Sequence, residues 1–218
     1  AGVERVVHFL AVSFPYSNMR WVAALPGETA ECVCRGLLEV FDRTGMAPRV
    51  VVFDNATGVG HRRPDGTVTQ TRLFSLFCAH YGFEPRFCNP YSGHEKGAVE
   101  SKVGMVRRKL FVPRPSVWSL ENFNAGLPDR CLELATKPHY RKDTEERGLF
   151  SEDRAALLPL PGKRFDVVTW RHMKADRYGV VTLEGRHRYS ADRANAGREV
   201  IVGLRALEVE VLDSSGKH

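Results

Sequence analysis

Apolar and polar residues along the first quarter of the chain form patterns that predict a hairpin, a helix and a strand. The runs VVHFLAVSF (residues 6–14) and RWVAAL (20–25) are rich in β-forming residues and flank the turn sequence PYSN, which predicts an antiparallel hairpin. The segment GETAECVCRGLLEVFDRTG predicts a helix, because Thr29 can cap its start and Gly45 can end it. The run PRVVVFDN is almost continuously apolar, as in a strand buried on both faces, and Asp54 lies at its C-terminal end.

The alternation of helix and strand continues through the middle of the chain. Residues 56–70 are polar and contain Gly and Pro, which predicts a loop. TRLFSLFCAHYG predicts an amphipathic helix that ends at Gly82, EPRFCN predicts a short strand, and a loop is expected over residues 90–97. Apolar residues then recur at helical spacing and predict a buried helix face, followed by a further helix over residues 119–135; the apolar positions are Val99, Val103, Val106 and Leu110.

The pattern changes near Phe165. From there, short alternating strands are separated by Gly and Asp turns, which is typical of a small all-β, barrel-like module. The Pro-containing segment LLPLPGKR precedes this module and resembles a linker. We therefore expect an α/β domain over residues 1–160 and a β module over residues 161–218.

Composition narrows the class of protein. The chain has 218 residues, 43% of them hydrophobic and 27% charged, as in soluble globular proteins. No apolar run approaches the roughly 20 residues that cross a bilayer, and the start lacks the order of a signal peptide, so a cytoplasmic protein without a membrane partner is expected. The five cysteines contain no Cys-x-x-Cys pair, which argues against structural zinc and indicates reduced thiols, several of them buried.

Positive charge is concentrated in one segment. The net charge is +6 and the isoelectric point is near 9.2. Residues 101–114 contain five basic side chains and no acid, which indicates a phosphate-bearing partner. A solvated helix face is the alternative, but neighbouring cations on one helix repel each other unless an anion neutralises them. The candidates for contacts to a DNA backbone are Lys102, Arg107, Arg108 and Lys109.

Two carboxylates have positions that suit metal binding. Asp54 ends a predicted buried strand, and Glu100 begins the helix that follows the next strand. Acids on adjacent elements can converge on Mg²⁺, which prefers oxygen ligands and can assist phosphoryl transfer. Each residue also has a simpler explanation: Asp54 or Asn55 can cap a turn, and Glu100 can interact with the dipole at a helix N-terminus.

Three stretches together resemble a known family. VVFDNATGVG, HYGFEPRFCNPYSGHEKGAVESKVGMVRRKLFVP and KPHYRK are similar to the IstA-type transposases of bacterial insertion sequences, members of the retroviral-integrase-like group with a ribonuclease H fold. SFPYSN and KADRYGVV extend the resemblance over almost the whole chain. The resemblance implies that Asp54 and Glu100 are the second and third of three catalytic acids and hold Mg²⁺, with Mn²⁺ as a substitute.

The resemblance also assigns residues around these acids. Asn55, directly after Asp54, and His94, Glu95 and Lys96, just before the helix of Glu100, would border the active site. Asn55, His94 and Lys96 are candidates for DNA contacts, although His94 can instead hydrogen-bond within its own loop. In the β module, basic side chains on predicted turns and edges would bind DNA or a neighbouring subunit, or would protect strand edges from aggregation; they are Lys174, Arg177, Arg186 and Arg188. The tryptophans Trp21, Trp118 and Trp170 are expected to be core or packing residues rather than platforms on which bases stack.

One feature of the family has no counterpart here. The family's first catalytic Asp lies in the first strand of the fold, upstream of the predicted hairpin, and Glu4 is the only acid before Glu28. We therefore expect a ribonuclease H-like domain that lacks its first strand, the Asp on it and an N-terminal helix-turn-helix region. The vacant position would be closed by pairing between the strands on either side or filled by another chain, and the chain alone is expected to be catalytically incompetent.

Two functions follow from these observations. The first is the catalytic core of a DNA transposase, in which Mg²⁺-assisted attack by water and then by a DNA 3′-hydroxyl cuts and joins insertion-sequence ends. The resemblance implies transposon-end and target DNA, a homo-oligomer and an AAA+ ATPase helper as partners, in the bacterial cytoplasm at the nucleoid. The alternative is a non-catalytic DNA-binding or subunit-interaction relic of such an enzyme.

Overall fold

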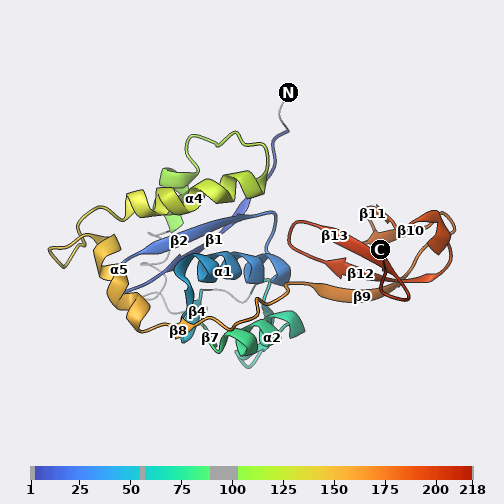
Figure 1. Cartoon of the computed structure of the whole chain (residues 1–218), viewed down its shortest axis with the longest axis horizontal. Helices are drawn as coiled ribbons and strands as arrows, with labels where there is room; N and C mark the ends of the chain where they lie inside the picture. The colour runs from blue at the N-terminus through green and yellow to red at the C-terminus, as the bar shows by residue number, and fades with distance from the viewer. Residues whose placement is uncertain (1–2, 55–56, 89–102, 218) are drawn as a thin grey trace. The chain divides into compact units, whose positions relative to one another are not determined.

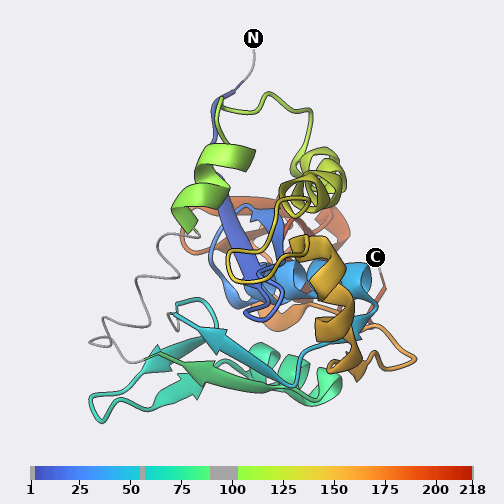
Figure 2. The ribbon, with the colours of Figure 1, turned by 90° about the vertical axis from the view of Figure 1, so that its left-hand side faces the viewer.

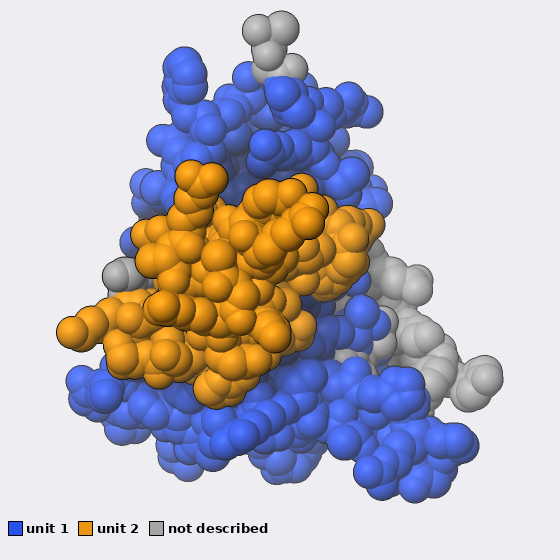
Figure 3. Space-filling view, turned by 90° about the vertical axis from the view of Figure 1, so that its right-hand side faces the viewer, with its two compact units in different colours: residues 1–165 blue, residues 166–218 orange. Residues whose placement is uncertain are grey.

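The computed structural model of the chain describes residues 3–54, 57–88 and 103–217 (Figure 1). The chain forms two compact units, Ala1–Phe165 and Asp166–His218 (Figure 3). The first unit is α/β and the second is all-β. Residues Asn55, His94, Lys96, Glu100 and Lys102 lie outside the described residues, and so do Val99 of the predicted helix face and the 90–97 loop.

The first unit opens with the predicted hairpin. Strands β1 (His8–Ser13) and β2 (Arg20–Leu25) pair antiparallel from His8 with Leu25 to Ser13 with Arg20. Helix α1 (Ala30–Thr44) then packs on this hairpin so closely that a Cβ on Gly36 would lie 2.9 Å from Leu10. Glycine at this position therefore sets the distance between helix and sheet.

Helix ends are where the sequence predicted them. Thr29 accepts a hydrogen bond from the Cys32 amide at the start of α1, and Gly45 ends the helix with φ of 68°. Helix α2 (Arg72–Tyr81) begins after the N-cap Thr71 and ends at Gly82 in the same conformation. Both predicted helices are confirmed.

The two longest strand pairs of the first unit, expected to be halves of one sheet, are separate from each other among the described strands. Strand β4 (Val50–Phe53) pairs in parallel with β7 (Glu84–Phe87), whereas β1 pairs only with β2. The predicted alternative in which β1 would pair with β4 is therefore wrong. Figure 2 shows the two strand pairs as distinct parts of the unit.

Both halves have an open edge. The amide of Ala24 on β2 bonds to a side chain away from β1, so its partner on β1, Phe9, also directs its backbone polar groups away from the pair. On β4, the carbonyls of Arg49 and Phe53 accept bonds from the β7 side, so Val50 and Val52 face the opposite side. Within the described residues, no backbone partner covers these positions.

The expectation that β4 is buried on both faces is wrong. Val52 is 63% exposed and Val50 36% exposed, whereas Val51 between them is 9% exposed. Because alternate side chains point to opposite faces of a strand, one face of β4 is buried and no described element buries the other. The apolar run therefore predicted burial on a second face that the described residues do not provide.

The segment predicted as a loop between Asp54 and α2 contains a second hairpin. Strands β5 (Gly60–Arg62) and β6 (Val68–Gln70) pair antiparallel from Gly60 with Gln70 to Arg62 with Val68. The loop prediction is wrong because its polar residues are ordered by turn hydrogen bonds rather than by apolar burial. Asp65 and Thr67 supply these bonds.

Aromatic rings fill the core beneath α1 and α2. Phe41 lies 5.9 Å from Phe77 and 5.1 Å from Tyr81, measured between ring centroids, and Phe83 packs against the same group. Phe53 at the end of β4 contacts Phe74 at 5.4 Å. The rings therefore fix the end of β4 against α2.

A second apolar cluster lies on β2 and the helices that follow. Helical residues 103–110 bury Val106 and Leu110, as predicted, against α4 (Leu120–Leu134) and α5 (Glu146–Ala155). α4 was predicted and α5 was not. The short strands β3 (Met46–Ala47) and β8 (Leu158–Pro159) also pair, so part of the predicted linker is a strand.

A buried ion pair ties the tip of the β1–β2 hairpin to α5. The Arg20 guanidinium lies 3.4 Å from the Glu146 carboxylate, and the two side chains are 5% and 2% exposed. Asn18 donates to the same carboxylate, and the Lys137 ammonium lies 3.5 Å from it. The hairpin tip is therefore held by polar contacts to residues more than a hundred positions later.

The second unit contains a three-stranded sheet and a hairpin. The sheet has the order β13 (Val209–Asp213), β12 (Glu199–Leu204), β9 (Thr169–Lys174), and β10 (Val180–Leu183) pairs with β11 (His187–Ser190). A short 3₁₀ helix covers Arg193–Asn195. The pairings recorded for these strands do not close into a barrel, so the barrel-like form stays a prediction.

The cysteine and tryptophan side chains differ in how deeply they are buried. The five cysteines all lie in the described residues and form no disulfide, and all but the half-buried Cys88 are buried. Trp21 is 6% exposed, but Trp118 is 99% exposed and Trp170 45% exposed. The expectation of a core or packing role is therefore wrong for Trp118, which lies on a loop, whereas Trp170 on the edge strand β9 is half-exposed and packs over Gly203. Among the described residues, no helix is long and apolar enough to cross a membrane.

Candidate functional site at the carboxyl edge of β4 and β7

Asp54 lies directly after β4, at the carboxyl end of the parallel pair. The Cys88 amide donates to the Phe53 carbonyl at 2.9 Å, so the chain just before Asp54 is joined to the end of β7. Asp54 is exposed, and within residues 3–54, 57–88 and 103–217 its carboxylate has no hydrogen bond or ion pair. Among these residues it caps no turn, and its oxygens are accessible from solvent.

The other predicted site residues around Asp54 lie outside the described residues. Glu100, His94 and Lys96 belong to the stretch 89–102, and Asn55 directly follows Asp54. Their roles stay predictions. Over the described residues, no group of three or more His, Cys, Asp or Glu side chains could hold a metal ion. Asp54 is therefore the one predicted acid whose position supports a site.

The β5–β6 hairpin was missed by sequence reasoning and reaches the same edge. The Arg62 guanidinium donates to the Cys88 carbonyl at 2.8 Å and to the Gly66 carbonyl at 2.7 Å. Because Cys88 also donates to Phe53, Arg62 is two hydrogen bonds away from the residue before Asp54. The Asp-Gly pair at the hairpin turn was the signal that could have revealed it.

The helical residues 103–110, named here the basic helix, present their charged side chains to solvent. Arg107, Arg108 and Lys109 are all exposed, while Val106 and Leu110 on the same turns are buried. None of the three cations has an ion pair within the described part of the chain. Three exposed cations on consecutive positions of one helix, without an ion pair among the described residues, attract a polyanion such as a nucleic acid backbone.

A further arginine lies beside this helix. The Arg130 guanidinium on α4 donates to the Lys109 carbonyl at 3.1 Å, where the basic helix ends. The contact satisfies a free carbonyl at a helix end and adds a positive charge to the basic face. Sequence reasoning missed it because Arg130 is remote from residues 101–114 in the chain.

The predicted cations of the second unit are more nearly neutralised. The guanidinium of Arg186 lies 3.8 Å from Glu184, and that of Arg188 lies 3.8 Å from Asp176. Arg177 stacks over the ring of Tyr178 at 4.8 Å. Lys174 ends β9 and is exposed. Residues 166–218 contain nine Lys and Arg against eight Asp and Glu, so the surplus positive charge belongs to the first unit.

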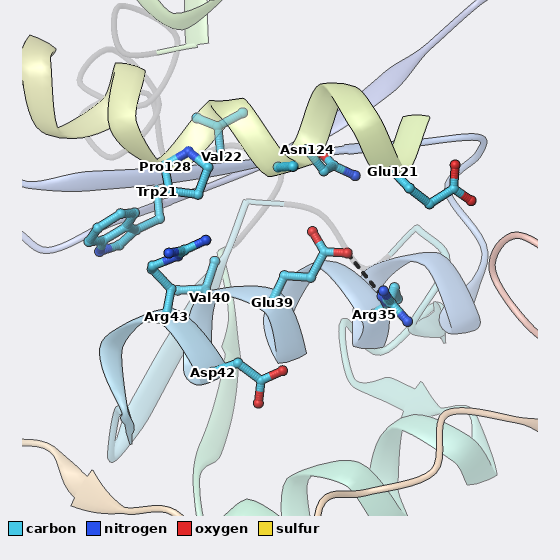
Figure 4. Close-up of a pocket in the computed structure, with 11 residues that line it drawn as sticks. Trp21, Val22, Arg35, Glu39, Val40, Asp42, Arg43, Glu121, Asn124 and Pro128 are labelled. Atoms are coloured by element: carbon cyan, nitrogen blue, oxygen red, sulfur yellow. Dashed lines mark hydrogen bonds and ion pairs between the residues drawn. The ribbon is translucent and has the colours of Figure 1, made fainter. Parts of the chain in front are cut away.

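A groove of about 390 Å³ lies between α1 and α4 (Figure 4). Its lining includes an Arg35–Glu39 ion pair of 2.9 Å and the apolar side chains of Val22 and Pro128. Asn124 lies in its wall and bonds to the backbone of β2. Asp54 and the basic helix do not line this groove, so it is not part of the candidate site.

Comparisons with known proteins place the chain among transposases. It is 29% identical over 207 residues to a putative transposase for insertion sequence element IS5376 from Geobacillus stearothermophilus, covering 94% of this chain and 50% of that protein. It is 38% identical over 187 residues to a transposase from Aminobacter aminovorans, covering 85% of this chain and 36% of that protein. The chain thus spans half or less of the length of these relatives. No protein-family model matches it.

Solved structures show the fold. A simian T-cell lymphotropic virus intasome in complex with PP2A regulatory subunit B56 gamma matches with a TM-score of 0.51 and 14% identity, covering 96% of this chain and 70% of that chain. The catalytic core domain of BIV integrase matches with a TM-score of 0.48 and 17% identity, covering 67% of this chain and 87% of that chain. The match to the intasome chain accordingly supports the expected ribonuclease H-like α/β fold of the first unit.

Proposed function

The chain belongs to the DDE-type transposases of bacterial insertion sequences, and we propose that it is the part of such an enzyme that binds DNA and supplies two of three catalytic acids. The reaction would be cleavage of a phosphodiester at an insertion-sequence end, followed by joining of the 3′-hydroxyl to target DNA. The observation that carries this proposal is the exposed carboxylate of Asp54 at the carboxyl edge of β4, which has no partner among the described residues, in a chain related to transposases.

Asp54 suits a hard divalent cation. A free carboxylate at a strand end offers the oxygen ligands that Mg²⁺ prefers. Asp54 and Glu100 would hold the ion, with Mn²⁺ as a substitute, and a bound ion would polarise the phosphodiester under attack. Among the described residues, Asp54 is the only predicted metal ligand at this edge. A complete metal site would therefore also need Glu100 and one further carboxylate.

The open edges of β1 and β4 support a site that is incomplete in this chain. Each edge has backbone groups able to pair with another strand. By resemblance, such a strand would bring the remaining Asp. We expect no strand transfer by the chain alone; Mg²⁺-dependent strand transfer that Asp54→Asn abolishes would contradict this expectation.

DNA binding is the activity that the chain itself should show. Arg107, Arg108 and Lys109 would bind phosphates and hold the duplex without reading its sequence. The second unit, which includes Lys174, is nearly neutral and would contribute less. A homo-oligomer and an AAA+ ATPase helper are further partners implied by the resemblance.

Fluorescence anisotropy with a labelled duplex tests DNA binding. The double variant Arg107→Ala/Arg108→Ala should bind all sequences more weakly and reduce the slope of log K against log salt by about two. The matched control is Arg147→Ala/Arg164→Ala, which removes the same charge from side chains 55% and 53% exposed. An equal loss in both double variants would show that only net charge matters and that the basic helix is no site.

The second candidate is a non-catalytic relic that binds DNA. It is favoured by the single carboxylate that the described residues offer at the candidate site. The coding sequence upstream separates the two: an in-frame strand with an Asp favours the enzyme, and its absence favours the relic.

A further inference from the structure

The hairpin of residues 60–70, named here the β5–β6 arm, is attached beside Asp54. Arg62 at the end of β5 donates to the Cys88 carbonyl at 2.8 Å, and the Cys88 amide donates to the Phe53 carbonyl at 2.9 Å. These bonds join the arm to the ends of both parallel strands. The arm therefore has a fixed position at the edge that presents Asp54.

The base of the arm is clamped on its other side. Gly58 has φ of 83°, and a Cβ there would lie 1.8 Å from the Glu28 carbonyl oxygen ahead of α1. Val59 is 1% exposed, and its carbonyl accepts from the Thr71 amide at 2.8 Å. The backbone thus enters and leaves the arm through a buried, hydrogen-bonded base.

The arm itself is ordered without an apolar core. Beyond Val59, none of residues 60–70 is buried. The turn is held by the Asp65 carboxylate, which accepts from the Thr67 amide at 2.9 Å and the Thr67 hydroxyl at 2.6 Å, and these bonds lower the pKa of Asp65. Arg62 adds a bond to the Gly66 carbonyl across the turn. An arm that buries nothing but is held rigid is available for contacts outside the chain.

The exposed side chains on the arm are cationic or polar. His61 and Arg63 are exposed and have no ion pair with any residue that the structure describes, and Asp65, the one acid of the arm, is engaged by Thr67. Figure 2 shows the arm extending away from the rest of the first unit. A rigid two-stranded ribbon with a free guanidinium near its tip has the shape and charge to follow a DNA duplex.

We propose that the β5–β6 arm binds the phosphodiester backbone of duplex DNA through Arg63, with His61 beside it, and holds the duplex next to Asp54. The inference rests on the proposed function, because it assigns a second contact to the same DNA. Arg62 is a positioning residue, since its guanidinium is engaged by the carbonyls of Cys88 and Gly66. The contact carries no sequence preference because phosphates are the same at every step.

The test measures binding of the full chain to a fluorescein-labelled 30-base-pair duplex over a salt series. Arg63→Ala should weaken binding by roughly 3–10-fold near 0.1 M salt and reduce the salt slope by about one. Arg63→Lys should restore most of the affinity, because a phosphate contact needs charge rather than the guanidinium shape. Arg147→Ala, which removes one exposed charge from α5, is the matched control and should change the affinity less than twofold.

The outcomes separate this inference from the proposed function. If Arg107→Ala/Arg108→Ala weakens binding while Arg63→Ala behaves like Arg147→Ala, the arm is not a DNA contact and the proposed function stands. If the unaltered chain binds no duplex even at 50 mM salt, both the inference about the arm and the proposed DNA binding are wrong. Far-UV circular dichroism tests whether Arg63→Ala is folded, as expected for an exposed side chain with no hydrogen bond or ion pair in the described part of the chain.

Discussion

The side-chain amide of Asn124 takes the place of a neighbouring strand for Ala24. Its oxygen accepts from the Ala24 amide at 2.7 Å, and its nitrogen donates to the Ala24 carbonyl at 2.8 Å. These two bonds close the outer edge of β2, which has no strand on that side among the described elements. β2 is thus protected by α4, whereas β1 and β4 keep open edges.

Removal of this amide should destabilise the first unit. Asn124→Ala leaves the Ala24 amide and carbonyl in a largely buried position without partners, at an expected cost of about 1–3 kcal/mol in the free energy of unfolding. Asn122→Ala is the matched control, because Asn122 is exposed on the same helix and its side chain makes no such bond. Urea unfolding of both variants measures the difference. Equal losses would mean that helix propensity, not the edge bonds, sets the effect.

The buried pair of Arg20 and Glu146 gives a second prediction. Glu146→Ala removes the carboxylate and leaves a 5%-exposed guanidinium without its charge partner, at an expected cost of about 3–5 kcal/mol. Glu145→Ala removes an acid that is 46% exposed and paired with Arg147, and should cost less than about 1 kcal/mol. Denaturant midpoints at pH 7 compare the two. A small effect of Glu146→Ala would show that water replaces the carboxylate at Arg20.

Much of the first unit could be predicted because its signals are local. Thr29, Gly45, Thr71 and Gly82 fix helix ends through capping bonds that depend on neighbouring residues only. The β1–β2 hairpin follows from alternation around a turn. Asp54 was placed correctly at a strand end for the same reason.

What could not be predicted depends on contacts distant in sequence or on missing neighbours. The apolar run of β4 indicated burial on both faces, but the exposure of Val52 depends on what packs on its face of the strand. The β5–β6 arm has almost no apolar pattern and is held by Asp65 and by the reach of Arg62 to Cys88. The neutralisation of Arg186 and Arg188 in the second unit is likewise set by the folded hairpin.

Two glycines, Gly58 at the base of the arm and Gly66 in its turn, allow a third prediction that separates backbone strain from steric clash. Gly58 and Gly66 both have positive φ, 83° and 87°, so alanine is strained at either position. Only at Gly58 would the Cβ meet a backbone atom, the Glu28 carbonyl oxygen at 1.8 Å, while nothing lies within 4 Å at Gly66. Gly66→Ala should cost about 1 kcal/mol and Gly58→Ala clearly more.

Thermal unfolding and duplex binding of these two variants provide the measurement. Gly58→Ala should lower the melting temperature further than Gly66→Ala and also weaken DNA binding, because it displaces the base of the arm from α1. If the two variants have the same melting temperature, the arm base is not packed against Glu28.

Buried thiols make stability depend on alkaline pH. Burial raises the pKa of the Cys78 thiol to about 12, and burial likewise raises the pKa of Cys34. The unfolded chain releases a thiol proton near pH 8.5, whereas the folded chain retains it to higher pH. The contribution of Cys78 to stability is therefore complete below about pH 8.5 and is lost as pH rises towards 12, by about 1.4 kcal/mol for each pH unit in between.

Comparison with Cys78→Ala isolates this effect. Between pH 9 and 10.5 the unaltered chain should lose about 1–2 kcal/mol more stability than Cys78→Ala, measured by urea unfolding at each pH. Below pH 8 the difference between the two should be constant, because the thiol is protonated in both the folded and the unfolded state. Parallel stability curves across the whole range would mean that the Cys78 thiol ionises in the folded chain as readily as in the unfolded one, and that α2 opens to solvent at this position.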